Sequence, residues 1–152
     1  MSGLRVSDDP TELDRDSIHR WIAEQSYWAQ GRTRETQDAA IAGSWSFGAY
    51  DEETGAQVGF ARVVTDRATF AWLCDVFVDD AARGRGVGKK LVEHITAELD
   101  RIGVRRTMLA TSDAHGLYAP YGFEPLAEPE KWMARQAPTA DAPGDAAVSA
   151  LA

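Results

Sequence analysis

The stretch of sequence that decides the fold runs from Val76 to Lys90 and reads Val-Phe-Val-Asp-Asp-Ala-Ala-Arg-Gly-Arg-Gly-Val-Gly-Lys-Lys. It begins as the end of an apolar run, passes through a short loop, and enters an amphipathic segment inside a cluster of glycines. An almost continuous apolar run is typical of a strand that is covered on both faces. The stretch therefore predicts a central strand, a tight turn, and a helix that begins within the turn.

This loop has the features of a site for a phosphate group. A helix that begins among glycines leaves its first backbone N–H groups without partners inside the helix. These groups and the positive end of the helix dipole attract an anion, and glycine lets the backbone approach it closely. Four cationic side chains lie here in a chain of net charge -8, namely Arg83, Arg85, Lys89 and Lys90. The alternative is a glycine cluster that serves only as a tight turn.

Two common phosphate-binding patterns do not fit this loop. A P-loop needs Ser or Thr where Lys90 stands, and it needs glycine where Arg83 stands. The dinucleotide pattern G-x-G-x-x-G, counted from Gly84, fails because its third glycine falls at Lys89. A nucleoside triphosphate site and a Rossmann dinucleotide site are therefore both disfavoured.

The segments around the loop alternate between helical and strand patterns. Apolar periodicity predicts helices over 18–25, 35–41, 87–102 and 114–118, and strands over 44–50, 57–65, 69–78 and 105–111, with further strands at 121–123 and 132–133. A strand, a helix and a strand in succession form a crossover between parallel strands. The fold class is therefore a mixed α/β sandwich.

Composition limits the classes of function. At 152 residues, with 44% hydrophobic and 26% charged residues, the chain has the size and make-up of one globular domain. The net charge of -8 argues against nucleic acid as a partner and mildly favours a cationic substrate, unless the charge serves only solubility. Residues 136–152 are rich in Ala and Pro and are expected to form a disordered tail.

Location and metal binding are also constrained. No apolar run reaches the roughly 18 residues that a membrane span needs, and the N-terminus lacks a secretory signal. The single cysteine, Cys74, can form no internal disulfide, and three dispersed histidines give no metal-ligand spacing. We expect a cytoplasmic protein of bacterial type that binds no membrane and no metal.

Two motifs carry a resemblance to a known family. Arg83, Gly86 and Gly88 form the pattern Arg-x-x-Gly-x-Gly, and residues 114–123 read Ala-His-Gly-Leu-Tyr-Ala-Pro-Tyr-Gly-Phe. Both motifs, at this separation and in this order of elements, resemble the GNAT superfamily of N-acetyltransferases. The resemblance implies an α/β fold of α+β character, in which helices flank both faces of a central mixed sheet, within a domain over residues 1–135.

The resemblance implies that acetyl-coenzyme A is the co-substrate. The loop would donate backbone N–H groups to the pyrophosphate, while the end of the central strand would pair with the pantetheine arm and polarise the thioester carbonyl. Thr111 stands where many relatives place an Asn that contacts the pantetheine arm. At this contact the chain departs from the family pattern. The implied cofactor-binding residues are Val76, Phe77, Val78, Arg83, Gly84, Arg85, Gly86, Val87, Gly88, Lys89, Thr111 and Tyr118.

Tyr118 occupies the family's general-acid position, where a hydroxyl can give a proton to the departing thiolate. Its alternative is a core tyrosine, and Tyr121 is a neighbouring candidate in a position that favours packing. Asp75, the charged residue in an apolar strand, either contacts the substrate or receives the amine's proton as a base, or it is a structural hydrogen-bonding group. His115 is a competing base, with a surface or capping role as its alternative. Cys74 is expected to be buried packing.

The resemblance implies acetyl transfer to a primary amine of a small molecule, directly within a ternary complex. Aromatic side chains such as Trp21, Tyr27 and Trp28 would hold a cation, or Arg32 and Arg34 would bind an acceptor carboxylate. The rivals are a non-catalytic acyl-CoA sensor and a scaffold for interactions. A homodimer is expected by analogy alone.

Overall fold

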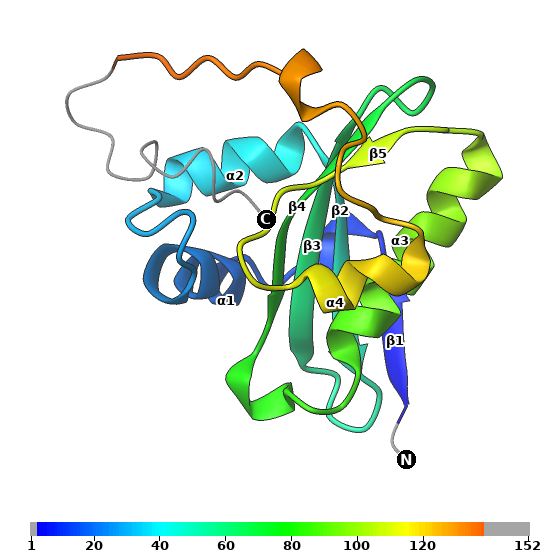
Figure 1. The fold of residues 1–152 in the computed structure, drawn as a ribbon. Coiled ribbons are helices and arrows are strands. Elements are labelled where there is room, and N and C mark those ends of the chain that lie inside the picture. The colour runs from blue at the N-terminus through cyan, green and yellow to red at the C-terminus, as the bar shows by residue number, and fades with distance from the viewer. Residues whose placement is uncertain (1–2, 139–152) are drawn as a thin grey trace.

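A computed structural model describes residues 3–138 and shows one sheet with helices against both of its faces (Figure 1). The strands are β1 (Leu4–Ser7), β2 (Trp45–Asp51), β3 (Gln57–Thr65), β4 (Ala71–Val78) and β5 (Thr107–Met108). The longer helices are α1 (Arg15–Arg20), α2 (Arg34–Ala42) and α3 (Val87–Ile102), with α4 (His115–Tyr118) as a single turn and η2 (Trp21–Gln25) as a π-helical turn. Short 3-10 turns are η1 (Pro10–Glu12), η3 (Asp80–Ala82), η4 (Ala119–Tyr121) and η5 (Pro129–Lys131). The predicted fold class is confirmed.

The strands lie in the sheet in their order along the chain. β1 to β4 are antiparallel to their neighbours, and β5 joins β4 in parallel after the crossover through α3. Strand β1 was not predicted, because its four residues lie in a polar N-terminal segment. It forms since Leu4 to Ser7 find backbone partners on β2, and only pairing across 41 or more residues could reveal it.

Two apolar cores hold the sheet between its helices. On one face α3 buries Val87, Leu91, Val92, Ile95 and Leu99 against β2, β3 and β4. On the other face α1, η2 and α2 pack against Phe60 and Phe77. Each fully buried side chain of this size stabilises the fold by about 1.5–3 kcal/mol relative to exposure. The helix predicted over 87–102 has the observed bounds.

A bulge in β4 separates that strand from β5. Phe60 pairs with Phe77 but Arg62 pairs with Cys74, so one β3 residue faces Asp75 and Val76 together. Asp75 has φ 53°, in the left-handed region that non-glycine residues seldom adopt. β5 pairs with β4 only through Thr107 and Met108, before the bulge. The predicted strand over 105–111 is therefore too long, since its second half diverges from β4.

The C-terminal strands predicted at 121–123 and 132–133 are wrong for the described residues. Residues 119–121 form the turn η4, and Gly122 ends it with φ 92°. Pro125 and Pro129 follow, and proline cannot donate to a strand ladder. Of the expected tail, 139–152 lie outside the described residues. Within residues 3–138, no helix combines the length and the apolar character that a bilayer crossing requires.

Candidate functional site

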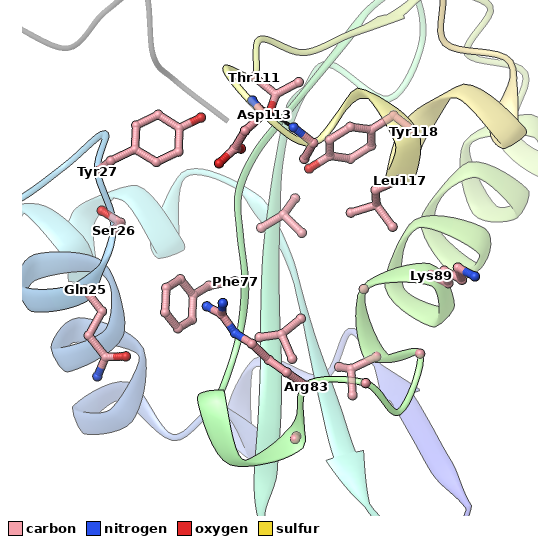
Figure 2. Close-up of a pocket in the computed structure, with 18 of the residues that line it drawn as sticks. Gln25, Ser26, Tyr27, Phe77, Arg83, Lys89, Thr111, Asp113, Leu117 and Tyr118 are labelled. Carbon is pink, nitrogen blue, oxygen red and sulfur yellow. Dashed lines mark hydrogen bonds between the residues drawn. The ribbon is translucent and has the colours of Figure 1, made fainter.

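The divergence of β4 from β5 opens a cavity of about 450 Å³ (Figure 2). One wall is the end of β4, and the opposite wall is the β5–α4 connection with α4 itself. The glycine loop and the first turn of α3 close one end, and residues 25–28, which run from the last residue of η2 onward, form the side. The lining combines Val76, Phe77, Val78, Arg83, Gly84, Gly86, Val87, Gly88, Lys89, Thr111 and Tyr118. All of the predicted cofactor-binding residues except Arg85 thus face one space.

The glycine loop presents backbone donors to this space. Gly84 and Gly86 have φ values of 83° and 79°, which a residue with a Cβ adopts only under strain. Gly86 is the N-cap of α3 and supplies no side chain to cap it. The first N–H groups of α3, from Val87 onward, therefore lack a capping acceptor within the described chain. Together with the helix dipole they form a site for an anion.

Charged side chains flank the anion end. The Arg83 guanidinium lies 5.8 Å from the centre of the Phe77 ring and forms an exposed ion pair with Asp80. Arg85 has a different role: its Nη1 donates to Asp51 Oδ2 at 3.0 Å and ties the loop to the end of β2. Its side chain is not part of the cavity lining. Of the two loop arginines, Arg83 is the one placed to meet a ligand.

The bulge changes which faces of β4 meet the cavity. In a regular strand successive side chains point to opposite faces, yet Val76, Phe77 and Val78 all line the cavity. Beyond Trp72, no pairing between β4 and β5 is present in the described chain. The backbone of this segment is thus accessible to a ligand arm that lies between the two strands.

Asp75 lies beneath this segment and does not line the cavity. Its carboxylate accepts from Trp28 Nε1 at 2.9 Å, Arg32 Nη1 at 2.6 Å and Arg62 Nε at 3.0 Å. The residue is 1% exposed. Burial alone would raise the pKa of Asp75, but the charges of Arg62 and Arg32 and the hydrogen bonds outweigh it and hold the pKa below its ordinary value. This geometry favours the structural role over that of a base.

Tyr118 lies in the cavity wall opposite β4 and is 3% exposed. Its ring meets that of Phe123 edge to face, with the two ring centroids 5.9 Å apart. Burial raises the pKa of Tyr118 well above its ordinary value, and the negative charge of Asp113 raises it further. The hydroxyl therefore stays protonated at neutral pH and can donate a hydrogen bond or a proton to a departing group.

The connection between β5 and α4 is held in place by polar contacts. Thr111 Oγ1 accepts from the backbone N–H of Ala114 at 3.1 Å, and the Ser112 N–H donates to the Tyr27 hydroxyl at 3.0 Å. The second contact joins two segments across the mouth of the cavity. Tyr121 donates its hydroxyl to the Lys89 carbonyl at 3.3 Å, a packing role in keeping with its turn position.

Two other candidates lie away from this space. His115 is exposed and lines a neighbouring groove between β5, α4 and residues 122–132, which shares Thr111 and Tyr118 with the cavity but leaves His115 outside the cavity lining. Cys74 is 2% exposed, and burial raises the pKa of its thiol to about 12, which leaves it protonated and unreactive. No group of three or more metal-ligating side chains gathers anywhere within residues 3–138.

The charged residue of the cavity that the sequence analysis missed is Asp113. Asp113 lines the cavity beside Tyr118, on the connection between β5 and α4. Its position between Thr111 and Tyr118, both of which the sequence had marked, was the available signal. A single acidic residue in a loop is too common for that signal to stand alone.

Comparison with known proteins gives the class of this molecule. The family model described as an acetyltransferase (GNAT) domain matches residues 43–125. A crystal structure described as a GNAT-family acetyltransferase of Xanthomonas campestris pv. campestris is 46% identical, has a TM-score of 0.84, and is covered over 96% of its chain and 91% of this one. A curated acetyltransferase of Gibberella zeae is 28% identical over 131 residues, 74% of each chain.

A more distant structure shares the fold and was solved with a ligand. N-acetylglutamate synthase from Neisseria gonorrhoeae, complexed with coenzyme A and N-acetyl-glutamate, is 20% identical with a TM-score of 0.67. The match spans 86% of this chain and 30% of the synthase chain. The fold and the family match define an acetyltransferase. The chain belongs to the GNAT family, as its two sequence motifs had predicted.

Proposed function

We propose that this protein transfers the acetyl group of acetyl-coenzyme A to the primary amine of a small molecule, directly within a ternary complex. The observation that carries the proposal is one continuous cavity with uncapped helix N–H groups at one end and the buried Tyr118 hydroxyl in its wall. The first feature suits a pyrophosphate and the second suits a departing thiolate.

The residues of the anion end fit coenzyme A. A Cβ built on Gly84 or Gly86 would meet no protein atom within 4 Å, so the space above each glycine is open to a ligand. Amides at the start of α3 would bind the pyrophosphate, and Arg83 and Lys89 would add positive charge. Acetyl-coenzyme A supplies an activated acyl thioester to the site. Val76, Phe77 and Val78 would hold the pantetheine arm through their exposed backbone groups.

The chemical step needs a donor near the sulfur and a polarised carbonyl. Backbone N–H groups near Val76 are the candidates for the carbonyl oxygen, because the bulge frees that segment from pairing with β5. Tyr118 would donate its proton to the sulfur as the carbon–sulfur bond breaks. Asp75, whose oxygens are all occupied, would fix the bulge instead of receiving the amine's proton.

A panel assay of thiol release from acetyl-coenzyme A, with amines, antibiotics and amino acids as acceptors, tests the proposal. Tyr118→Phe is expected to lower kcat by about 100-fold or more, within the range for loss of a general acid, with the affinity for acetyl-coenzyme A nearly unchanged. Binding of the thioester without release for any acceptor would favour the acyl-CoA sensor. A kcat for Tyr118→Phe within twofold of the parent protein would remove the general-acid role.

A further inference from the structure

Charge is unevenly distributed along the cavity. Of the described residues that line it, three carry a charge: Arg83, Lys89 and Asp113. The two cations lie at the glycine loop, whereas Asp113 lies with Tyr27 and Tyr118 at the opposite end (Figure 2). One end therefore favours an anion, and the other presents a carboxylate and two hydroxyls.

The position of Asp113 is set by its neighbours. Its backbone N–H donates to Thr111 Oγ1 at 3.4 Å, and the adjacent Ser112 N–H donates to the Tyr27 hydroxyl at 3.0 Å. Figure 2 shows the Asp113 side chain directed toward the space between the two tyrosines. Within the described chain, no ion pair or side-chain hydrogen bond engages its carboxylate. Its negative charge remains available to a ligand.

The arginines that could bind an acceptor carboxylate are already occupied. Arg32 Nη1 donates to Gln37 Oε1 at 3.0 Å as well as to Asp75. Arg34 is engaged by Asp16 and Asp38, and neither arginine lines the cavity. Among the described lining residues, an acceptor carboxylate near the amine would meet no cation at this end and would be repelled by Asp113.

We propose that Asp113, with the hydroxyls of Tyr27 and Tyr118, binds an acceptor that is a cationic amine and carries no carboxylate beside its amino group. The inference deepens the proposed function and rests on it. It resolves the choice between a cation and an amino acid that the sequence left open.

The step balances without a further reactant. The ammonium loses one proton to solvent at the end of the cavity where the exposed Asp113 lies. The amine nitrogen then forms a bond to the acyl carbon, and the carbon–sulfur bond breaks. The sulfur takes its proton from the Tyr118 hydroxyl. The nitrogen then gives its second proton to the Tyr118 oxygen, which restores the hydroxyl. The products are an amide, the thiol of coenzyme A and one proton in solution.

Acceptor pairs that differ by one carboxylate test the inference: cadaverine with lysine, agmatine with arginine, and tyramine with tyrosine. In at least one pair, we expect kcat/KM to be at least 10-fold higher for the amine than for the matching amino acid. In no pair should the amino acid be preferred by that factor. Asp113→Asn is expected to lower that value by about 10- to 100-fold, mainly through KM, as loss of a charge-assisted contact predicts. Asp100→Asn, an exposed site on α3, is the matched control and should change nothing.

A binding measurement separates the two proposals. Calorimetric titration of the preferred amine into the protein saturated with coenzyme A should show binding that Asp113→Asn weakens, while the affinity for acetyl-coenzyme A stays the same. Turnover that prefers amino acids, or an unchanged amine preference in Asp113→Asn, overturns the inference and leaves acetyl transfer standing. Thioester binding without turnover of any acceptor overturns the proposed function, and the inference with it.

Discussion

Replacement of Asp75 by Asn tests the buried contact that joins β4 to β3 and to the segment after η2. The carboxylate accepts hydrogen bonds from Trp28, Arg32 and Arg62, which come from the segment after η2 and from β3. The substitution keeps the shape of the side chain and removes its charge. Two arginine side chains, each 13% exposed, then face each other without a counter-charge.

The expected loss of stability follows from this burial. Removal of one partner from a buried ion pair costs about 3–5 kcal/mol, because the remaining charge is left uncompensated. The arginines keep some contact with water, so the lower end of that range applies, about 3 kcal/mol. For a domain of this size, about 3 °C of Tm accompanies each kcal/mol, so Tm should fall by about 10 °C.

Urea unfolding followed by circular dichroism measures this change directly. The midpoint should move to lower urea while the slope m stays constant. Asp113→Asn is the matched control, since its carboxylate is exposed and should leave the midpoint in place. A double-mutant cycle with Arg62→Gln should give a coupling energy of about 1–3 kcal/mol between the two residues.

The pH dependence has a definite sign. The pKa of Asp75 is lower in the folded protein than in the unfolded chain, because the two arginines outweigh the effect of burial. Its contribution is therefore fully present above the unfolded pKa and is lost as the pH falls through the folded pKa. The difference between the parent protein and Asp75→Asn should be constant at neutral pH and shrink only in strongly acidic solution.

Two results would refute this reasoning. An unfolding free energy for Asp75→Asn within 1 kcal/mol of the parent would show that the buried charge does not hold the bulge. Unchanged stability together with a large loss of kcat, and loss of the acidic limb of the pH–rate profile, would instead make Asp75 the base.

Two further predictions concern the loop and the cysteine. Gly86→Ala should raise KM for acetyl-coenzyme A and cost about 1–2 kcal/mol of stability, because φ is 79°; Gly103→Ala, at φ 85° on the far end of α3, should cost as much without changing KM. Equal KM values in the two variants would argue against a binding role for the loop. Cys74 should react with iodoacetamide at pH 8 only after denaturation, because burial raises its pKa to about 12, and Cys74→Ala should keep full activity; rapid labelling of the folded protein would contradict the buried position.

Much of the central fold could be predicted because its signals are local. The helix over 87–102 has a sharp start at glycine and an apolar stripe at helical spacing, and its bounds were predicted correctly. The strands over 57–65 and 69–78 were predicted within two residues of their observed bounds. Strand β1 and the C-terminal segment could not be predicted in the same way. Pairing with β2 decides the first, and the absence of pairing within the described residues decides the second.

In the candidate site, too, local features could be predicted from the sequence and long-range contacts could not. By itself the sequence predicted the phosphate-binding loop and identified the family, because glycines, a helix start and a Tyr in a fixed motif are neighbours along the chain. Only the tertiary structure placed Asp75 beneath β4 with three hydrogen-bond donors, and Asp113 in the wall of the cavity. Tyr27 meets Ser112 across 85 residues, and Trp28 meets Asp75 across 47. Contacts at such separations depend on how the two faces of the sheet pack, and no local pattern of residues records them.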